Sequence, residues 1–237
     1  MKGRRQPQMT RRWASLALAV LFGGLQGCNA VSGVGEIAFV ACAIHLGDIE
    51  GTALAGGAGG DAFDDVCPEG QVLVGFRSGV YDGGVALSGL GGVCATPGLS
   101  SGGASTLALS PGASLPSHGM MAARIESVMC PEGQVVVGYE GRAFTDAVSQ
   151  GTYLSRLAIR CAPLVIEGLP DAPATSRGAI STMSSLGDAV DDGAVPIPAT
   201  DCPEGQIAVA SRGRSTAVVD AFGLGCAPPT VTCAEDE

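Results

Sequence analysis

The sequence lacks three features that would assign it to common classes of protein. No apolar run reaches the roughly 20 residues of a membrane-spanning helix. No long segment places apolar residues at a helical period between capping residues, so a helical protein is not expected. Lysine occurs once, at Lys2, and the 13 basic residues face 23 acidic ones. Because nucleic-acid binding needs clustered Lys and Arg, that class of function is excluded.

Motifs of catalysis and metal binding are missing as well. The sequence contains no G-x-S-x-G or H-E-x-x-H segment and no C-x-x-C or H-x₃-H spacing. His45 and His118 are isolated, and we interpret both as ordinary surface or packed histidines. We therefore predict that the protein is not an enzyme and needs no cofactor or metal. A hydrolase is the least favoured alternative.

The amino-terminal segment indicates export. Residues 1–12 carry five basic residues and no acid, and an apolar stretch follows from Trp13 to Leu25. A basic segment before a short apolar stretch is typical of a secretory signal. The stretch ends in Leu25-Gln26-Gly27-Cys28, which resembles a bacterial lipobox, where a peptidase cuts before the cysteine and a diacylglycerol is joined to its sulfur. We expect lipidated Cys28 to become the first residue, and cleavage after Ala30 is the alternative.

Removal of residues 1–27 makes the chain strongly acidic. Eight arginines then face 23 carboxylates, a formal charge of −15. Anionic lipid headgroups repel such a surface, so attachment to a membrane would depend on several acyl chains. We expect an exported protein that is lipid-anchored to the cell envelope, with glycans or envelope proteins as its partners. Asn29, where an aspartate resembles an inner-membrane retention signal, favours the outer membrane.

The rest of the chain repeats three times. The segment C-P-E-G-Q begins at Cys67, Cys130 and Cys202, and a β-branched, apolar run follows each time. A second half-motif has apolar residues seven and four positions before a cysteine. It ends at Cys94, Cys161 and Cys226. Val and Ile favour strands, Pro-Glu-Gly favours a turn, and Gly-rich stretches connect the half-motifs. The sequence therefore predicts an all-β protein with short strands.

Nine cysteines are too many for a reduced protein without metal-site spacing. In an antiparallel pair, the first residue of one strand lies opposite the last residue of the next, at a Cα distance compatible with a disulfide. This geometry pairs the cysteines within each repeat. If Cys28 is lipidated, Cys42 and Cys233 remain to join the two ends. The predicted bridges are Cys67–Cys94, Cys130–Cys161, Cys202–Cys226 and Cys42–Cys233.

The full repeated pattern is C-P-x-G, an apolar strand, a Gly-rich loop and L-x-x-φ-x-φ-x-C. This pattern resembles the vitelline membrane outer layer protein family, whose members resemble jacalin-type lectins in fold. Residues 56–65, G-G-A-G-G-D-A-F-D-D, are similar to the opening of jacalin-type domains. The resemblance implies a three-fold pseudosymmetric β-prism-like body from three Cys-bridged repeats over residues 42–233. A string of three small sandwiches is the alternative, although units of about 65 residues would each have a small core.

Candidate ligand-binding residues are few. Jacalin-type sugar sites use a freed amino-terminal glycine and a loop near the carboxy end with an aromatic residue and an Asp. The nearest loop here, residues 212–220, has no aromatic residue, so the resemblance transfers no sugar site. Tyr81, Asp82 and Asp220 remain the candidates. Two matching clusters of aspartates could offer oxygen ligands to Ca²⁺, although repeated turns explain them better. They are Asp61, Asp64 and Asp65, and Asp188, Asp191 and Asp192.

The sequence as a whole favours a lipid-anchored, disulfide-stapled, non-catalytic binding or structural protein of the bacterial cell envelope. A carbohydrate-binding, lectin-like protein is the alternative. The expected segments are a signal peptide (1–27), a lipidated linker (28–41), a single β-prism-like domain (42–233) with repeats of about 42–105, 106–170 and 171–233, and an acidic tail (234–237).

Overall fold

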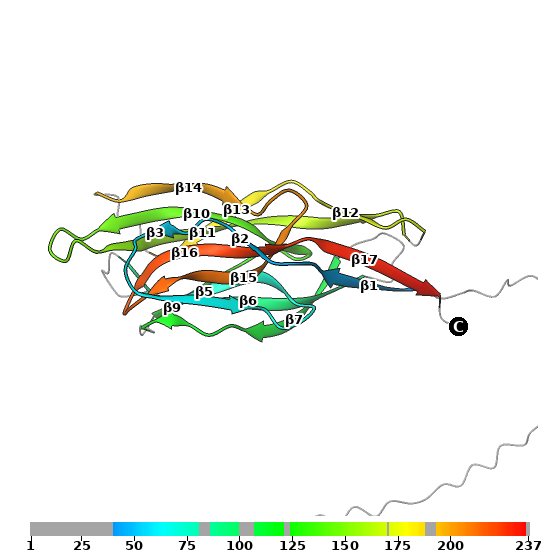
Figure 1. The fold of residues 1–237 in the computed structure, drawn as a ribbon, viewed down its shortest axis with the longest axis horizontal. Coiled ribbons are helices and arrows are strands. Elements are labelled where there is room, and N and C mark those ends of the chain that lie inside the picture. The colour runs from blue at the N-terminus through cyan, green and yellow to red at the C-terminus, as the bar shows by residue number, and fades with distance from the viewer. Residues whose placement is uncertain are drawn as a thin grey trace, which may run out of the picture. The chain divides into compact units, whose positions relative to one another are not determined.

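The structure of the protein is a computed structural model in which every regular element is a strand. The model describes residues 40–80, 86–99, 107–120, 124–169, 171–187 and 193–235. These ranges form 17 strands and no helix, so the predicted all-β class is confirmed (Figure 1). They belong to one compact unit, Ala38–Glu237. Within them, no helix is long and apolar enough to cross a membrane. The predicted signal and Cys28 lie outside the described residues.

Fifteen strands form three sheets that share one plan. Each sheet has a central hairpin, a split strand beside the second strand of the hairpin, and another strand beside the first. Sheet I consists of β5 (Val72–Val80), β6 (Leu87–Leu99), β7 (Leu107–Ser114), β8 (His118–Gly119) and β9 (Arg124–Met129). Sheet II consists of β10 (Gln134–Thr145), β11 (Thr152–Glu167), β12 (Ala174–Arg177), β13 (Ser181–Leu186) and β14 (Val195–Asp201). Sheet III consists of β15 (Ile207–Ser215), β16 (Val219–Ala227), β2 (Glu50–Gly51), β3 (Ala55–Gly56) and β4 (Asp61–Val66).

The three hairpins surround one core. Their first strands, β5, β10 and β15, contact one another, and so do their second strands, β6, β11 and β16. At the centre, the ring of Phe222 packs edge-on against Phe76 and Tyr139, with ring centroids 5.3 and 5.1 Å away. Phe76 and Tyr139 occupy the same position in the first two repeats. The predicted three-fold pseudosymmetric, β-prism-like body is therefore confirmed.

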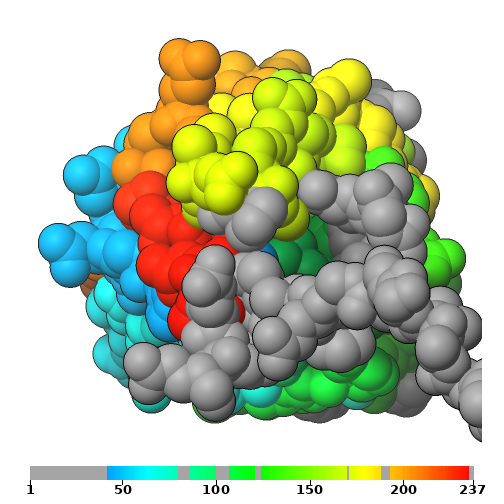
Figure 2. All heavy atoms as spheres, turned by 90° about the vertical axis from the view of Figure 1, so that its right-hand side faces the viewer, coloured from blue at the N-terminus to red at the C-terminus, as the bar shows by residue number. Residues whose placement is uncertain are grey.

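A two-stranded ribbon of β1 (Val40–Leu46) and β17 (Pro229–Glu235) closes one end of the body. It packs on a second apolar cluster, in which Val72, Val135 and Ile207 are fully buried. Figure 2 looks onto this end, where the red β17 lies beside the yellow-green region of β12. The Thr175 hydroxyl donates a hydrogen bond to the carbonyl of Pro229 there (2.8 Å). We refer to this end as the turn end, and to the end where the three hairpins reverse direction as the tip end.

The C-P-E-G-Q segments form the same turn three times at the turn end. The amides of Gln71, Gln134 and Gln206 donate hydrogen bonds of 2.9 to 3.0 Å to the carbonyls of the prolines three residues earlier. The glycine before each glutamine has a φ between 71° and 75°. A positive φ at this position defines a type II turn, and glycine adopts it without the steric cost of a side chain. The repeated segment therefore encodes a chain reversal.

A β-bulge follows each turn at an equivalent place. The hairpin register shifts between Leu73 and Gly75 in sheet I, and at the matching residues of sheets II and III. The bulged residue has a carbonyl that leaves the hairpin ladder. In sheet I this residue is Val74, and its carbonyl accepts the amide of Cys130 (2.8 Å). Cys202 and Val137 form the same contact, as do Cys67 and Val209. Each repeated cysteine is therefore held on the sheet that the chain is about to leave.

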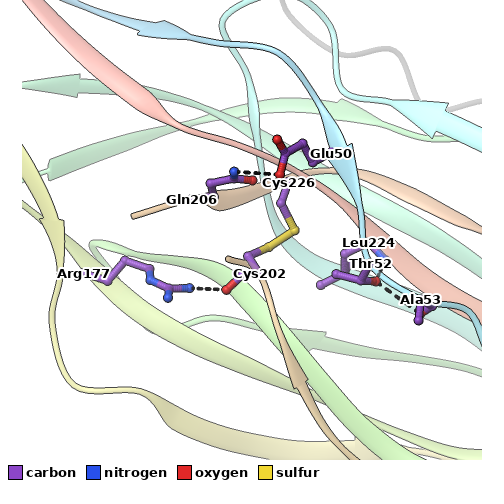
Figure 3. The surroundings of a disulfide bond; sticks show 8 residues. All are labelled: Glu50, Thr52, Ala53, Arg177, Cys202, Gln206, Leu224 and Cys226. Carbon is purple, nitrogen blue, oxygen red and sulfur yellow. Dashed lines mark hydrogen bonds between the residues drawn. A yellow bond between two sulfur atoms is a disulfide. The ribbon is translucent and has the colours of Figure 1, made fainter. Parts of the chain in front are cut away.

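The eight described cysteines form the four pairs expected from the sequence. Three of these disulfides join neighbouring sheets. Cys67, Cys130 and Cys202 each follow the outer strand of one sheet, and their partners lie in the second hairpin strand of the next, at Cα distances of 5.9, 5.7 and 5.7 Å. Around Cys202–Cys226, Arg177 of sheet II donates to the Cys202 carbonyl (3.1 Å), and Gln206 donates to Glu50 of sheet III (3.3 Å) (Figure 3).

The geometry expected for these three bridges was wrong. In the hairpin register Cys94 faces Leu73, and Cys226 faces Ala208, so the bridges do not span a hairpin. The type II turn separates each first cysteine from the hairpin that follows it and leaves that cysteine on the previous sheet. Cys42 and Cys233, by contrast, are direct strand partners in the ribbon, with Cα atoms 4.0 Å apart.

Candidate functional site

Asp220 lies at the tip end, directly after the reversal between β15 and β16. The reversal is tight, because the Thr216 amide donates to the carbonyl of Val218 (3.0 Å). Asp220 is the second residue of β16, and only 3% of its surface is exposed. A carboxylate this deeply buried in a Val- and Ala-rich reversal is unusual, since buried acids normally have a cationic or strongly hydrogen-bonding partner.

A glycine-rich loop from the other end of the chain covers this carboxylate. The Gly57 amide donates to the backbone carbonyl of Asp220 (2.7 Å). A Cβ on Gly59 or Gly60 would lie 2.7 or 2.6 Å from a carboxylate oxygen of Asp220. Gly60 also has a φ of 74°, which other residues rarely adopt. Only glycines therefore allow the loop of residues 56–60 to lie this close to the carboxylate.

Arg214 holds the loop in place. This arginine is in β15, and its Nε and Nη2 donate to the carbonyls of Gly59 (2.8 Å) and Gly60 (2.7 Å). The two parallel hydrogen bonds use the fork geometry of the guanidinium, which restrains the orientation of the two peptide groups. The positive charge also lies close enough to act on Asp220. The loop, the arginine and the carboxylate therefore form one unit.

The carboxylate of Asp220 accepts hydrogen bonds from Thr216. Burial raises the pKa of Asp220, while hydrogen bonds from Thr216 and the charge of Arg214 lower it to a smaller extent. Within the described residues, Thr216 supplies its side-chain hydrogen bond, from Oγ1 to Oδ2, and this bond is long at 3.4 Å. An ionised carboxylate can accept about four hydrogen bonds. Asp220 therefore retains capacity for donors from a ligand.

All three sheets contribute to the surroundings of this site. The amide of Met120, which follows β8 of sheet I, donates to the carbonyl of Ala217 (2.9 Å). A Cβ on Gly57 would lie 2.2 Å from the carbonyl oxygen of Thr152, the first residue of β11 in sheet II. The tip end thus brings backbone groups from distant segments to the edge of a buried carboxylate.

Of the other candidate residues, the ones that the structure describes have partners of their own. Tyr81 and Asp82 lie outside the described residues, as do Asp188, Asp191 and Asp192. In β4, Asp64 forms an ion pair with Arg212 (2.9 Å), and Asp65 contacts the His118 ring (2.5 Å), which stacks on Phe63. Asp61, at the start of β4, pairs with Ser215 in the register. In the part of the chain that the structure describes, no three His, Cys, Asp or Glu residues are placed to hold a metal ion.

Sequence analysis missed Arg214 and Thr216 as parts of this site. Arg214 donates to carbonyls 155 and 154 residues away along the chain, so no local pattern could connect them. The glycine-rich loop resembles the opening of a known type of domain in sequence. That resemblance gives no indication of its contact with Asp220. The signal present in the sequence is limited to four glycines within residues 56–60 and a single acidic residue, Asp220, within residues 205–234.

No family model and no curated protein matches this chain. Solved structures of lectins are similar to it. Malaysian banana lectin has 14% identity and a TM-score of 0.46, over 76% of this chain and 99% of the lectin. The mannose-specific jacalin-related lectin of Morus nigra has 18% identity and a TM-score of 0.46, over 76% and 94%. Calystegia sepium agglutinin has 15% identity and a TM-score of 0.46, over 76% and 96%. We assign no residue role from these similarities.

Proposed function

We propose that this protein is a non-catalytic carbohydrate-binding protein and that Asp220, under the loop of residues 56–60, binds the sugar. The observation that carries this proposal is the Asp220 carboxylate, which lies beneath the glycine loop at the tip end and retains acceptor capacity. Perturbed pKa values cluster at functional sites, so a buried ionisable group with few partners is a candidate for a functional group.

A sugar suits this arrangement chemically. Adjacent hydroxyl groups of a sugar can donate two hydrogen bonds to one carboxylate, and hydrogen bonds to a charged group are stronger than those between neutral groups. Backbone groups of the glycine loop approach the carboxylate because side chains are absent there. Arg214 and Thr216 keep Asp220 oriented before a ligand arrives. Such preorganisation reduces the entropy lost on binding.

A glycan array followed by isothermal titration calorimetry tests this proposal. We expect at least one neutral glycan to bind, and Asp220→Asn to weaken it about tenfold or more, because the amide loses a charged acceptor. Asp64→Asn is the matched control, since Asp64 belongs to the same sheet but pairs with Arg212. Equal binding by wild type and Asp220→Asn, or no binding to any glycan, would contradict the proposal.

We also propose that the protein is exported and anchored to the cell envelope, more specifically the outer membrane, through a lipid on Cys28. The eight other cysteines are paired with one another, so Cys28 is the one left for a different modification. A palmitate analogue should label the wild-type protein and not Cys28→Ala, and fractionation should recover the label with the outer membrane. Labelling that persists in Cys28→Ala excludes this anchor.

A further inference from the structure

Sheet II carries a cavity of about 450 Å³ on its outer face, away from the Asp220 site. It lies over the hairpin β10–β11, between β13 on one side and β14 on the other. Its charged lining groups are Arg142, Arg156 and Glu140. Serine hydroxyls from β13 and apolar groups from β14 complete the wall, including Ser184, Ser185, Pro196 and Ile197.

The two arginines are direct cross-strand partners. Arg142 of β10 faces Arg156 of β11 in the hairpin register, so both side chains lie on the same face of the sheet. Arg142 has a partner of its own, so Arg156 is the arginine of the pair that is available to a ligand. A half-buried arginine in a concave wall raises the local concentration of anions, because the surrounding protein excludes water.

The fold itself does not need this pair. The equivalent cross-strand pair in sheet I is Gly79 and Gly89, and in sheet III it is Arg214 and Ala221. Sheet I therefore forms with no side chains at this position, and sheet III with a single arginine opposite an alanine. Arg214 is fully engaged with two backbone carbonyls. The facing arginines are a property of sheet II alone, so a structural requirement of the repeat does not explain them.

Arg156 differs from the nearby Arg160 in its partners. Arg160 is neutralised, with Nε and Nη2 on the two carboxylate oxygens of Asp201 at 2.7 and 3.1 Å and with Glu140 at 3.5 Å. Arg156 donates from Nε to the hydroxyl of Ser185, and within the described residues no carboxylate lies within ion-pair distance of it. A neutral hydroxyl leaves the guanidinium charge uncompensated. The remaining donors of Arg156 therefore suit an anionic ligand.

We propose that this cavity binds a carboxylate-bearing saccharide, such as a uronic acid unit of a glycan. The guanidinium of Arg156 would pair with the carboxylate in the bidentate geometry that Arg favours. Ser184 and Thr182 offer hydroxyls, and Ile197 and Pro196 offer an apolar wall for the ring face. Glu140 and the acidic chain as a whole disfavour polyanions, which selects a ligand with a single negative charge.

Calorimetric titration with glucuronate, glucose and sulfate tests this site. We expect glucuronate to bind, glucose to bind at least tenfold more weakly, and sulfate not to compete, because sulfate lacks a sugar ring. Equal competition by sulfate would overturn the assignment of a saccharide. Failure of wild type to bind glucuronate at millimolar concentration would overturn the site itself.

Substitutions separate this site from Asp220. Arg156→Gln should weaken glucuronate binding about tenfold or more, since it removes the charge. Arg156→Lys keeps the charge but not the fork and should weaken binding less, and it replaces the glutamine variant if that variant does not fold. Arg212→Gln is the control, because Arg212 lies on the outer face of sheet III with Asp64 as its partner. The Arg156 variants are also measured in the Asp220→Asn background, so that sugar bound at the tip end does not contribute. Glucuronate binding in that background that survives in both Arg156 variants, or that is absent while Arg156 is intact, contradicts a separate site.

Discussion

The turn end and the tip end of this protein are built from the same three repeats but differ in how far those repeats agree. At the turn end, the type II turn, the bulge and the inter-sheet bridge occur three times with nearly the same distances. At the tip end, the two reversals that the structure describes differ in length, residues 146–151 in sheet II and 216–218 in sheet III, and the second places Asp220 under a glycine loop. The turn end holds the three sheets together, so residues at the tip end can serve in ligand binding.

Both ends depend on the central core, so a substitution in the core should have the largest effect on the free energy of unfolding. Phe222 is fully buried and packs against Phe76 and Tyr139. Phe222→Ala should lower the free energy of unfolding by about 3–5 kcal/mol, because it deletes a large apolar side chain and leaves a cavity. Urea unfolding followed by circular dichroism measures this change. A loss below about 1 kcal/mol would mean that each sheet is stable without the shared centre.

Loss of one inter-sheet bridge should have the next largest effect. Replacement of both Cys202 and Cys226 by alanine frees a loop of 24 residues and should cost about 3 kcal/mol of unfolding free energy in the chain-entropy model. Glycan binding at the tip end should persist at temperatures where the variant remains folded. Binding that disappears while the fold remains would show that the two ends are coupled more strongly than their separation suggests.

Two glycines with nearly the same φ, one at each end, allow the turn end and the tip end to be compared directly. Gly205 at the turn end has a φ of 75° and open space around it, whereas Gly60 at the tip end has a φ of 74° and would place a Cβ against Asp220 and Ser215. Gly205→Ala should cost about 1 kcal/mol, from backbone strain alone. Gly60→Ala should cost more and should also abolish glycan binding. Thermal unfolding and calorimetry of both variants decide this, and equal effects of the two substitutions would contradict the close packing of the loop.

The smallest expected effect is a dependence of stability on pH. Because burial raises the pKa of Asp220, the folded protein holds this proton to a higher pH than the unfolded chain does. The contribution of Asp220 to stability is thus fully present below its ordinary pKa and is lost as pH rises through the folded value. Asp220→Asn should therefore be more stable than wild type at pH 7, and the difference should vanish near pH 3. Urea unfolding at both pH values measures it, with Asp64→Asn as control. A variant less stable than wild type at pH 7 would mean that Asp220 is better paired than its contacts indicate.

The sequence was sufficient to predict what is local or repeated. The C-P-E-G-Q segments and the β-branched runs after them predicted the strands. The repeated half-motifs predicted three pairs of cysteines, although through a geometry that was wrong, and parity predicted Cys42–Cys233. The inter-sheet position of the bridges was not predictable, because it depends on contacts such as the one that holds the Cys130 amide on the carbonyl of the bulged residue Val74 in sheet I. The contact between Asp220 and the loop of residues 56–60 joins segments from opposite ends of the chain. Arg142 and Arg156 face each other because of the register between β10 and β11. That register cannot be predicted from the sequence of one repeat.

Sheet III has a consequence for the order of folding. Its hairpin comes from residues 207–227, but β2, β3 and β4 come from residues 50–66, and the hydrogen bond from Arg214 to Gly59 spans 155 residues. Sheets I and II can form from contiguous chain, whereas sheet III requires nearly the whole chain to have emerged. Contacts of such high sequence separation form slowly, because loop closure precedes any gain from packing. As the chain is made from its amino terminus, β4 therefore stays without its partner β15 until residues 207–215 are available for pairing.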